Sequence, residues 1–163
     1  MKHEIEPVYD GNSRILILGS FPSEASRKQG FYYGHPRNRF WRVISGVLGC
    51  GTPETVDEKK RMLLSHGVAL WDVVGSCTVK GSADSSIKDV LPNDLSVIFG
   101  AADIKAVYLN GSAAFSLYEK YGDGSVPYFR MPSTSPANAS YSYEALLDAW
   151  SVIRCMLETR RCP

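Results

Sequence analysis

Apolar and polar positions along the chain follow two alternating patterns. Short, almost uninterrupted apolar runs predict buried strands at residues 14–20, 68–74, 104–109 and 126–131. Helices are predicted between and after these strands, at residues 36–48, 57–65, 93–99, 112–121 and 141–160. Asp84 and Ser85 are interpreted as the cap of a further helix that begins at Ile87. Pro127 places the last strand at an edge of the sheet.

Strands that alternate with helices predict a three-layer α/β/α domain with a four-stranded, mostly parallel sheet. The 163 residues fit a single domain, because the chain shows no repeat, low-complexity tract or linker. In such sheets ligands bind beyond the carboxyl ends of the strands. Functional residues are therefore expected in the segments that follow the strands, at residues 20–38, 72–86, 110–112 and 132–140.

Composition and charge narrow the function only slightly. Hydrophobic residues are 44% and charged residues 21% of the chain, which is typical of a soluble globular protein. The 18 basic and 17 acidic residues leave a net charge of +1, so the charge does not indicate the strongly basic domain that is typical of nucleic-acid-binding proteins. Such a partner stays open, because backbone N–H groups, hydroxyls and helix N-termini also bind phosphates.

Cysteine spacing and the N-terminus predict a cytoplasmic protein. The segment from Met1 to Pro7 has no apolar run, and no run in the chain is long enough to span a bilayer. No two of the four cysteines form a C-x-x-C pair, and we expect free thiols. No His, Cys, Asp or Glu cluster has metal-ligand spacing, so we expect no metal and no cofactor. We also expect a monomer.

The connection between the first strand and the next helix is the segment richest in candidate chemistry. It is far longer than an ordinary strand-to-helix loop, which indicates a function. Phe31, Tyr32 and Tyr33 stand between glycines, and nucleobases stack on aromatic rings of this kind. Asn38 stands in the first turn of the following helix, where its amide can reach the cleft. The alternative is that Phe31 and Tyr32 fill the core and that Asn38 only caps the helix.

Two strings in this connection resemble a known family. Gly-Ser-Phe-Pro-Ser at residues 19–23, followed by Tyr-Tyr-Gly-His-Pro-Arg-Asn-Arg-Phe-Trp at residues 32–41, is similar to the uracil-DNA glycosylase superfamily. The similarity is greatest to the mismatch-specific branch and to the family 6 hypoxanthine-DNA glycosylases, and it covers residues 14–157. It implies hydrolysis of the N-glycosidic bond of a flipped-out, deaminated nucleotide during base excision repair.

The resemblance also implies catalytic residues. Uracil-excising branches carry an Asp or Asn for the attacking water in the loop that matches residues 19–23, where this chain has Ser20 and Phe21. That departure favours hypoxanthine as substrate, with uracil second. It matches the hypoxanthine branch, in which the Asn of the second string, here Asn38, is catalytic. Ser20 and Ser23 are expected to assist with the water. His35 either polarises a phosphate or the leaving base, or makes a structural hydrogen bond.

Asp72 follows the second strand, where uracil-specific relatives place an Asn that reads the base edge. An ionised carboxylate only accepts hydrogen bonds, which suits the N1–H of hypoxanthine. The alternative is that Asp72 bonds its own backbone in a turn. The predicted base-binding residues are Phe21, Phe31, Tyr32, Tyr33 and Asp72.

The loop after the fourth strand resembles the family's His-Pro-Ser-Pro loop, which enters the minor groove and pinches phosphates. Its hydroxyls can donate to phosphate oxygens without a net charge. The family's His falls on Ser133, so a cationic helper for the leaving base is missing. Without the resemblance, these residues would read as a turn. The predicted DNA-binding residues are Ser133, Thr134, Ser135, Pro136, Ala137 and Asn138.

The sequence thus predicts a DNA glycosylase without a strand-cleaving step, because no motif places a lysine as a Schiff-base nucleophile. The rival is a non-catalytic nucleic-acid-binding module that retains the glycosylase fold. The missing Asp or Asn at Ser20 and Phe21 and the missing His at Ser133 are what favour the rival, because fold alone does not guarantee chemistry.

Overall fold

A four-stranded parallel sheet forms the centre of the molecule. The computed structural model describes residues 1–78, 87–122 and 124–158. Its sheet has the order β2-β1-β5-β6, and all three neighbouring pairs are parallel. The strands are β1 (Ile15–Gly19), β2 (Val68–Asp72), β5 (Ala106–Asn110) and β6 (Tyr128–Met131). β6 follows Pro127 and lies at an edge, as predicted.

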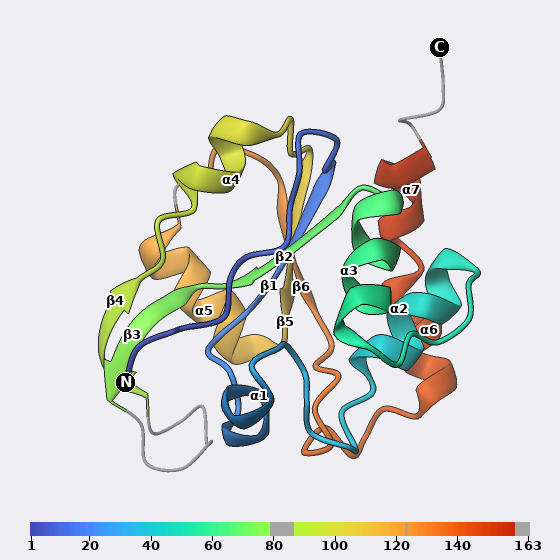
Figure 1. The fold of residues 1–163 in the computed structure, drawn as a ribbon, viewed down its shortest axis with the longest axis horizontal. Helices are drawn as coiled ribbons and strands as arrows, with labels where there is room; N and C mark the ends of the chain where they lie inside the picture. Colours follow the sequence, from blue (N-terminus) through green and yellow to red (C-terminus); the bar gives the residue numbers. More distant parts are fainter. Residues whose placement is uncertain (79–86, 123, 159–163) are drawn as a thin grey trace.

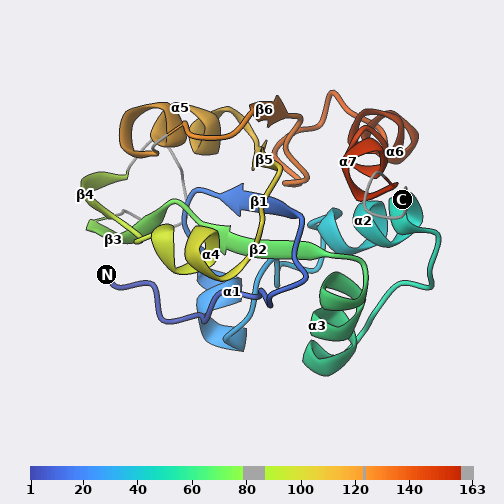
Figure 2. The same cartoon turned by 90° about the horizontal axis from the view of Figure 1, so that it is seen from above.

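Helices cover both faces of this sheet (Figures 1 and 2). One face packs against α2 (Phe40–Leu48), α3 (Val56–Ser65), α6 (Tyr143–Trp150) and α7 (Ile153–Glu158). The other face packs against α4 (Ser96–Ala101) and α5 (Ser112–Tyr121). Ile15 and Ile17 of β1 enter the first core and Leu16 and Leu18 the second, because successive side chains of a strand point to opposite faces. The predicted three-layer α/β/α architecture is confirmed.

A second, two-stranded sheet was not predicted. The apolar run at residues 68–74 ends as a strand at Asp72, and β3 (Val74–Thr78) then pairs antiparallel with β4 (Lys88–Pro92). The prediction of a helix from Ile87 is therefore wrong, and Asp84 and Ser85 lie outside the described residues. One continuous strand was predicted over residues 68–74 because Val73 and Val74, which lie beyond the end of β2, are also apolar and buried.

Several helix boundaries also differ from the prediction. The first predicted helix begins at Phe40, and the loop before it contains α1 (Glu24–Gln29). The helix predicted at residues 93–99 begins only at Ser96, as α4, and the Asn93 amide donates to the carbonyls of Asp72 and Val74. The last predicted helix is divided into α6 and α7 at residues 151–152. Before α2 and before α4, the side chains of Asn38 and Asn93 bond backbone groups, and such bonds compete with helix formation.

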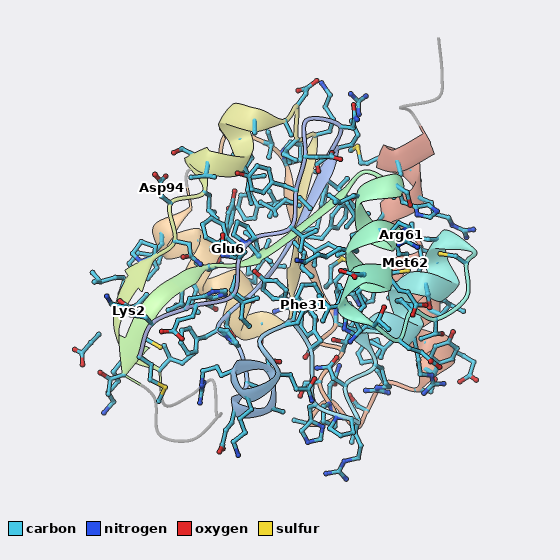
Figure 3. All side chains as sticks on the ribbon, in the orientation of Figure 1. Lys2, Glu6, Phe31, Arg61, Met62 and Asp94 are labelled. Atoms are coloured by element: carbon cyan, nitrogen blue, oxygen red, sulfur yellow. The ribbon has the colours of Figure 1, made fainter. Side chains whose placement is uncertain are left out.

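The N-terminal segment runs along the strands that lead to the carboxyl edge of the sheet. Lys2 pairs with Ser76 of β3, and Val8 pairs with Leu70 of β2. Figure 3 labels Lys2 beside β3 and Glu6 further along this path. His3 is consequently held near the end of β2 by its own N–H, which donates to the carbonyl of Gly75 at 2.7 Å.

Among the helices of the described ranges, none has the length and apolar character needed to cross a membrane.

Candidate active site

A pocket of about 210 Å³ opens at the carboxyl ends of the parallel strands. Every residue predicted for the site lines it except Phe31, Ala137 and Asn138. Gly19, Pro22, Ser26 and Asn110 complete its wall. The topology explains this convergence, because strand ends of a parallel sheet share one edge. The predicted residues in the pocket are Ser20, Phe21, Ser23, Tyr32, Tyr33, His35, Asn38, Asp72, Ser133, Thr134, Ser135 and Pro136.

The side-chain amide of Asn38 is fixed by two donors. Its Oδ1 accepts from the N–H of Phe40 and from the hydroxyl of Thr134, each at 2.9 Å. A carbonyl oxygen offers two lone pairs, and both are therefore used. Within the described residues the Nδ2 of Asn38 makes no hydrogen bond, so it is the part of the amide that can serve a ligand. Asn38 thus bonds the N–H of the first residue of α2 and also faces the pocket, although the N-cap position itself is occupied by Arg39.

Asn110 orients the partner of Asn38. Its Nδ2 donates to the Thr134 hydroxyl at 3.0 Å, and its Oδ1 accepts the Thr134 N–H at 3.1 Å. Thr134 is fully buried. The hydroxyl of Thr134 accepts from Asn110 and therefore points its proton at Asn38. This chain of hydrogen bonds keeps the Asn38 amide in one of its two flipped orientations.

Arg39 holds the loop at residues 133–138 against the start of α2. Its N–H donates to the carbonyl of Thr134 at 3.0 Å, and its guanidinium donates to the carbonyls of Asn138 and Tyr141. This clamp explains why Thr134 meets Asn38, 96 residues earlier in the chain. The sequence did not identify Arg39, since its role is to bind carbonyl oxygens of a distant loop.

The hydroxyls of the same loop accept hydrogen bonds locally. Ser133 accepts the N–H of Ser135, and Ser135 accepts the N–H of Ala137. Their O–H protons make no hydrogen bond within the described residues. Ala137 and Asn138 lie outside the pocket and line a neighbouring hollow together with Arg130 and Ser112.

Asp72 lies at the floor of the pocket and is bonded to His3. Its Oδ2 lies 2.8 Å from the Nε2 of His3, and its side chain is only 5% exposed. Neither sequence interpretation foresaw this partner, which is 69 residues away. The other oxygen, Oδ1, lies against Gly19: a Cβ atom at that position would be 2.4 Å from Oδ1 and 3.0 Å from the Tyr33 hydroxyl. Glycine is therefore required at residue 19 for this arrangement.

The three consecutive aromatic residues have different roles. Tyr33 lines the pocket, adopts a left-handed backbone conformation with φ 54°, and stacks on Phe40 at 4.1 Å. Phe31 lies in the core, stacked on Trp41 and beside α3 (Figure 3). Phe31 therefore fills the core, which was the alternative interpretation of this residue. Its position does not support the prediction that it contacts a base.

Tyr32 touches the pocket but is buried behind it. Its hydroxyl donates to the carbonyl of Glu6 at 2.8 Å and so fastens the N-terminal segment. Burial first, and then the negative charge of Asp72, raise the pKa of the Tyr32 phenol far above its usual value. Tyr32 therefore stays a neutral donor.

The remaining predicted residues shape the first loop. The Ser23 hydroxyl caps α1 by accepting the N–H of Ser26, and it donates to the Ser26 hydroxyl at 3.1 Å. Ser26 in turn accepts the N–H of Gly34, which closes the loop on itself. The Nδ1 of His35 accepts the N–H of Arg37. Ser23 is thus engaged in capping and has no hydroxyl proton left for a water.

Within the described part of the chain, no group of three His, Cys, Asp or Glu side chains could hold a metal ion. Cys50, Cys77 and Cys155 are free thiols, and Cys162 lies outside the described residues.

Comparison with known proteins assigns the class. The profile of the uracil DNA glycosylase superfamily matches residues 6–154, and the chain belongs to this superfamily. It is 36% identical over 145 residues to a hypoxanthine DNA glycosylase of Methanosarcina acetivorans. The matched region covers 87% of this chain and 91% of that protein. It is also 36% identical over 113 residues to a hypoxanthine DNA glycosylase of Methanosarcina barkeri, covering 68% of this chain and 71% of that protein.

A solved structure agrees with the fold. The solution NMR structure of a candidate uracil DNA glycosylase from Methanosarcina acetivorans superposes with a TM-score of 0.82 at 32% identity. The match covers 96% of this chain and 98% of that chain. The parallel sheet and its helices are therefore those of the superfamily.

Proposed function

We propose that this protein is a DNA glycosylase that removes deaminated bases in base excision repair, with hypoxanthine as the preferred base and uracil second. One observation carries the proposal: a fixed amide donor, Asn38, and a buried carboxylate, Asp72, line the same pocket. Hypoxanthine presents both an N–H and acceptor atoms on its edges, and this pair complements them. The two hypoxanthine DNA glycosylases at 36% identity support the same substrate.

The reaction follows from this arrangement. The damaged nucleotide leaves the duplex and its base stacks beside Tyr33, with its N1–H toward Asp72. The bond between C1′ and the base breaks through an oxocarbenium-like state, and its electron pair passes to the base. The Nδ2 of Asn38 donates to this departing base and stabilises the developing negative charge. Water, held by backbone groups of residues 20–23, adds to C1′, and its proton ends on the base.

The loop at residues 133–138 is proposed to bind the DNA backbone. Ser133 and Ser135 have hydroxyl protons that can be donated to phosphate oxygens. Arg130 and Ser112 line the adjoining hollow and supply further donors.

Because one chain completes the pocket, we propose a monomer. Free thiols suit a reducing compartment, and we propose that it acts in the cytoplasm.

The test is excision from oligonucleotides that carry inosine, uracil or xanthine, with abasic sites revealed by alkali. We expect excision of hypoxanthine to exceed that of uracil by about tenfold or more, since a polar site discriminates strongly between base edges. An oligonucleotide with adenine is the control, and a chelator in a parallel reaction checks that no metal is needed. Tight binding without abasic sites would instead identify the non-catalytic module.

Replacing Thr134 with valine tests the orienting chain of hydrogen bonds. Valine keeps the shape but removes the hydroxyl that donates to Asn38. We expect hypoxanthine excision to slow by about tenfold, because one hydrogen bond that fixes the amide is lost. The matched control is Thr78→Val, at an exposed position in β3. Equal single-turnover rates for Thr134→Val and the wild type would show that the amide needs no such support.

A further inference from the structure

His3 is fixed beside Asp72 by contacts on both sides of it in the chain. The Met1 amino group donates to the carbonyl of Cys77 at 2.7 Å, and the His3 N–H donates to Gly75. On the other side, the Tyr32 hydroxyl donates to the carbonyl of Glu6. These contacts fix the position of the His3 ring, as packing fixes a core residue, although His3 is only the third residue of the sequence.

The surroundings of His3 define which of its ring nitrogens is the donor. Its side chain is 1% exposed, and its ring lies among those of Phe21, Tyr32 and Trp71 at centroid distances of 6.0, 5.9 and 6.4 Å. Its Nδ1 is buried and has no hydrogen-bond partner within the described residues. A proton on Nδ1 would be a buried donor without an acceptor, which is costly. Nε2 is therefore the ring nitrogen that carries the proton and donates it to Asp72.

We propose that His3 is a positioning residue that sets the base specificity of the pocket. The inference rests on the proposed function, in which Asp72 reads the edge of the base. By donating to Oδ2, the ring holds the Asp72 carboxyl group in one orientation and leaves Oδ1, beside Gly19 and Tyr33, as the oxygen that meets the ligand. A carboxylate oxygen accepts the N1–H of hypoxanthine and repels the bare N1 of adenine.

Loss of the ring removes this constraint. The buried Oδ2 of Asp72 then lacks its donor, and a buried polar atom without a hydrogen-bond partner is unfavourable. The side chain is then free to turn, so that Oδ1 is no longer held toward the ligand. The pocket then loses its preference for hypoxanthine over adenine.

The experiment compares His3→Ala with His3→Gln. Alanine removes the donor, whereas the glutamine amide can still reach Asp72. We expect His3→Ala to slow single-turnover excision of hypoxanthine by about tenfold to a hundredfold, the value of a hydrogen bond to a charged group. His3→Gln should recover most of that rate. His66→Ala, at a histidine outside the pocket, is the matched control.

Two further readouts separate this proposal from the proposed function. Nitrogen chemical shifts of the His3 ring report directly which nitrogen carries a proton, and an Nε2 without a proton would overturn the proposal. So would equal excision rates for the wild type, His3→Ala and His3→Gln. Should the wild type excise no base, the proposed function fails. Binding of free hypoxanthine over adenine then decides the role of His3: a preference lost in His3→Ala and kept in His3→Gln supports it, and an unchanged preference refutes it.

Discussion

Replacing Asn38 with alanine is expected to slow hypoxanthine excision by about a hundredfold or more, the scale seen when one preorganised donor is removed from an active site. The Nδ2 of Asn38 is held ready because both lone pairs of Oδ1 are already engaged. Affinity for DNA that contains inosine should change far less, since backbone contacts and stacking beside Tyr33 remain. Single-turnover kinetics and equilibrium binding measure the two effects separately.

Asn38→Asp identifies which end of the amide acts. One carboxylate oxygen can still accept from Phe40 and Thr134, while the other replaces the donor with an acceptor. We expect a loss as large as for alanine, and retained activity would instead indicate that residue 38 holds the water. Asn12→Ala, at an exposed position, is the control. If Asn38→Ala lowers only thermal stability, its role is capping, and catalysis must be sought at Asp72 or His35.

Much of this site could be predicted because parallel strands share one carboxyl edge. Asp72 and Asn110 end two strands and Ser133 follows a third, and the topology alone brings them to one pocket. Asn38 could be assigned to the site only from the family resemblance, because an Asn at this position is equally typical of a helix cap. Local pattern and family likeness therefore gave the positions of the side chains but not their hydrogen bonds.

The partners of these side chains could not be predicted, because they are distant in sequence. His3 meets Asp72 only through pairing of the N-terminal segment with β3 and β2, and no periodicity signals an isolated bridge of this kind. The roles of the three aromatic residues were equally hidden. Tyr33 reaches the pocket through a left-handed backbone conformation, which turns it away from the core position of Phe31.

Asp72→Asn is expected to abolish most hypoxanthine excision, by about a hundredfold or more, because a polar site with one mismatched hydrogen-bonding group rejects its ligand strongly. The Nε2–H of His3 will hold the amide oxygen where Oδ2 now lies. The amide nitrogen then takes the place of Oδ1 beside Gly19 and presents a donor to the N1–H of the base. Single-turnover excision measures the loss, with Asp148→Asn on the exposed face of α6 as control.

The double variant His3→Ala with Asp72→Asn makes this prediction specific. Without the histidine the amide is free to turn its oxygen to the pocket, so the double variant should excise hypoxanthine faster than Asp72→Asn alone. His3→Ala slows excision when it is made alone, so independent effects would make the double variant slower still. A faster double variant would therefore show that the two residues are coupled. Thermal stability should also fall with each change, because a buried hydrogen bond to a charged group is weakened or lost. An Asp72→Asn variant with wild-type activity would show that residue 72 does not read the base, and recognition would then have to reside in Asn38 and the backbone of the first loop.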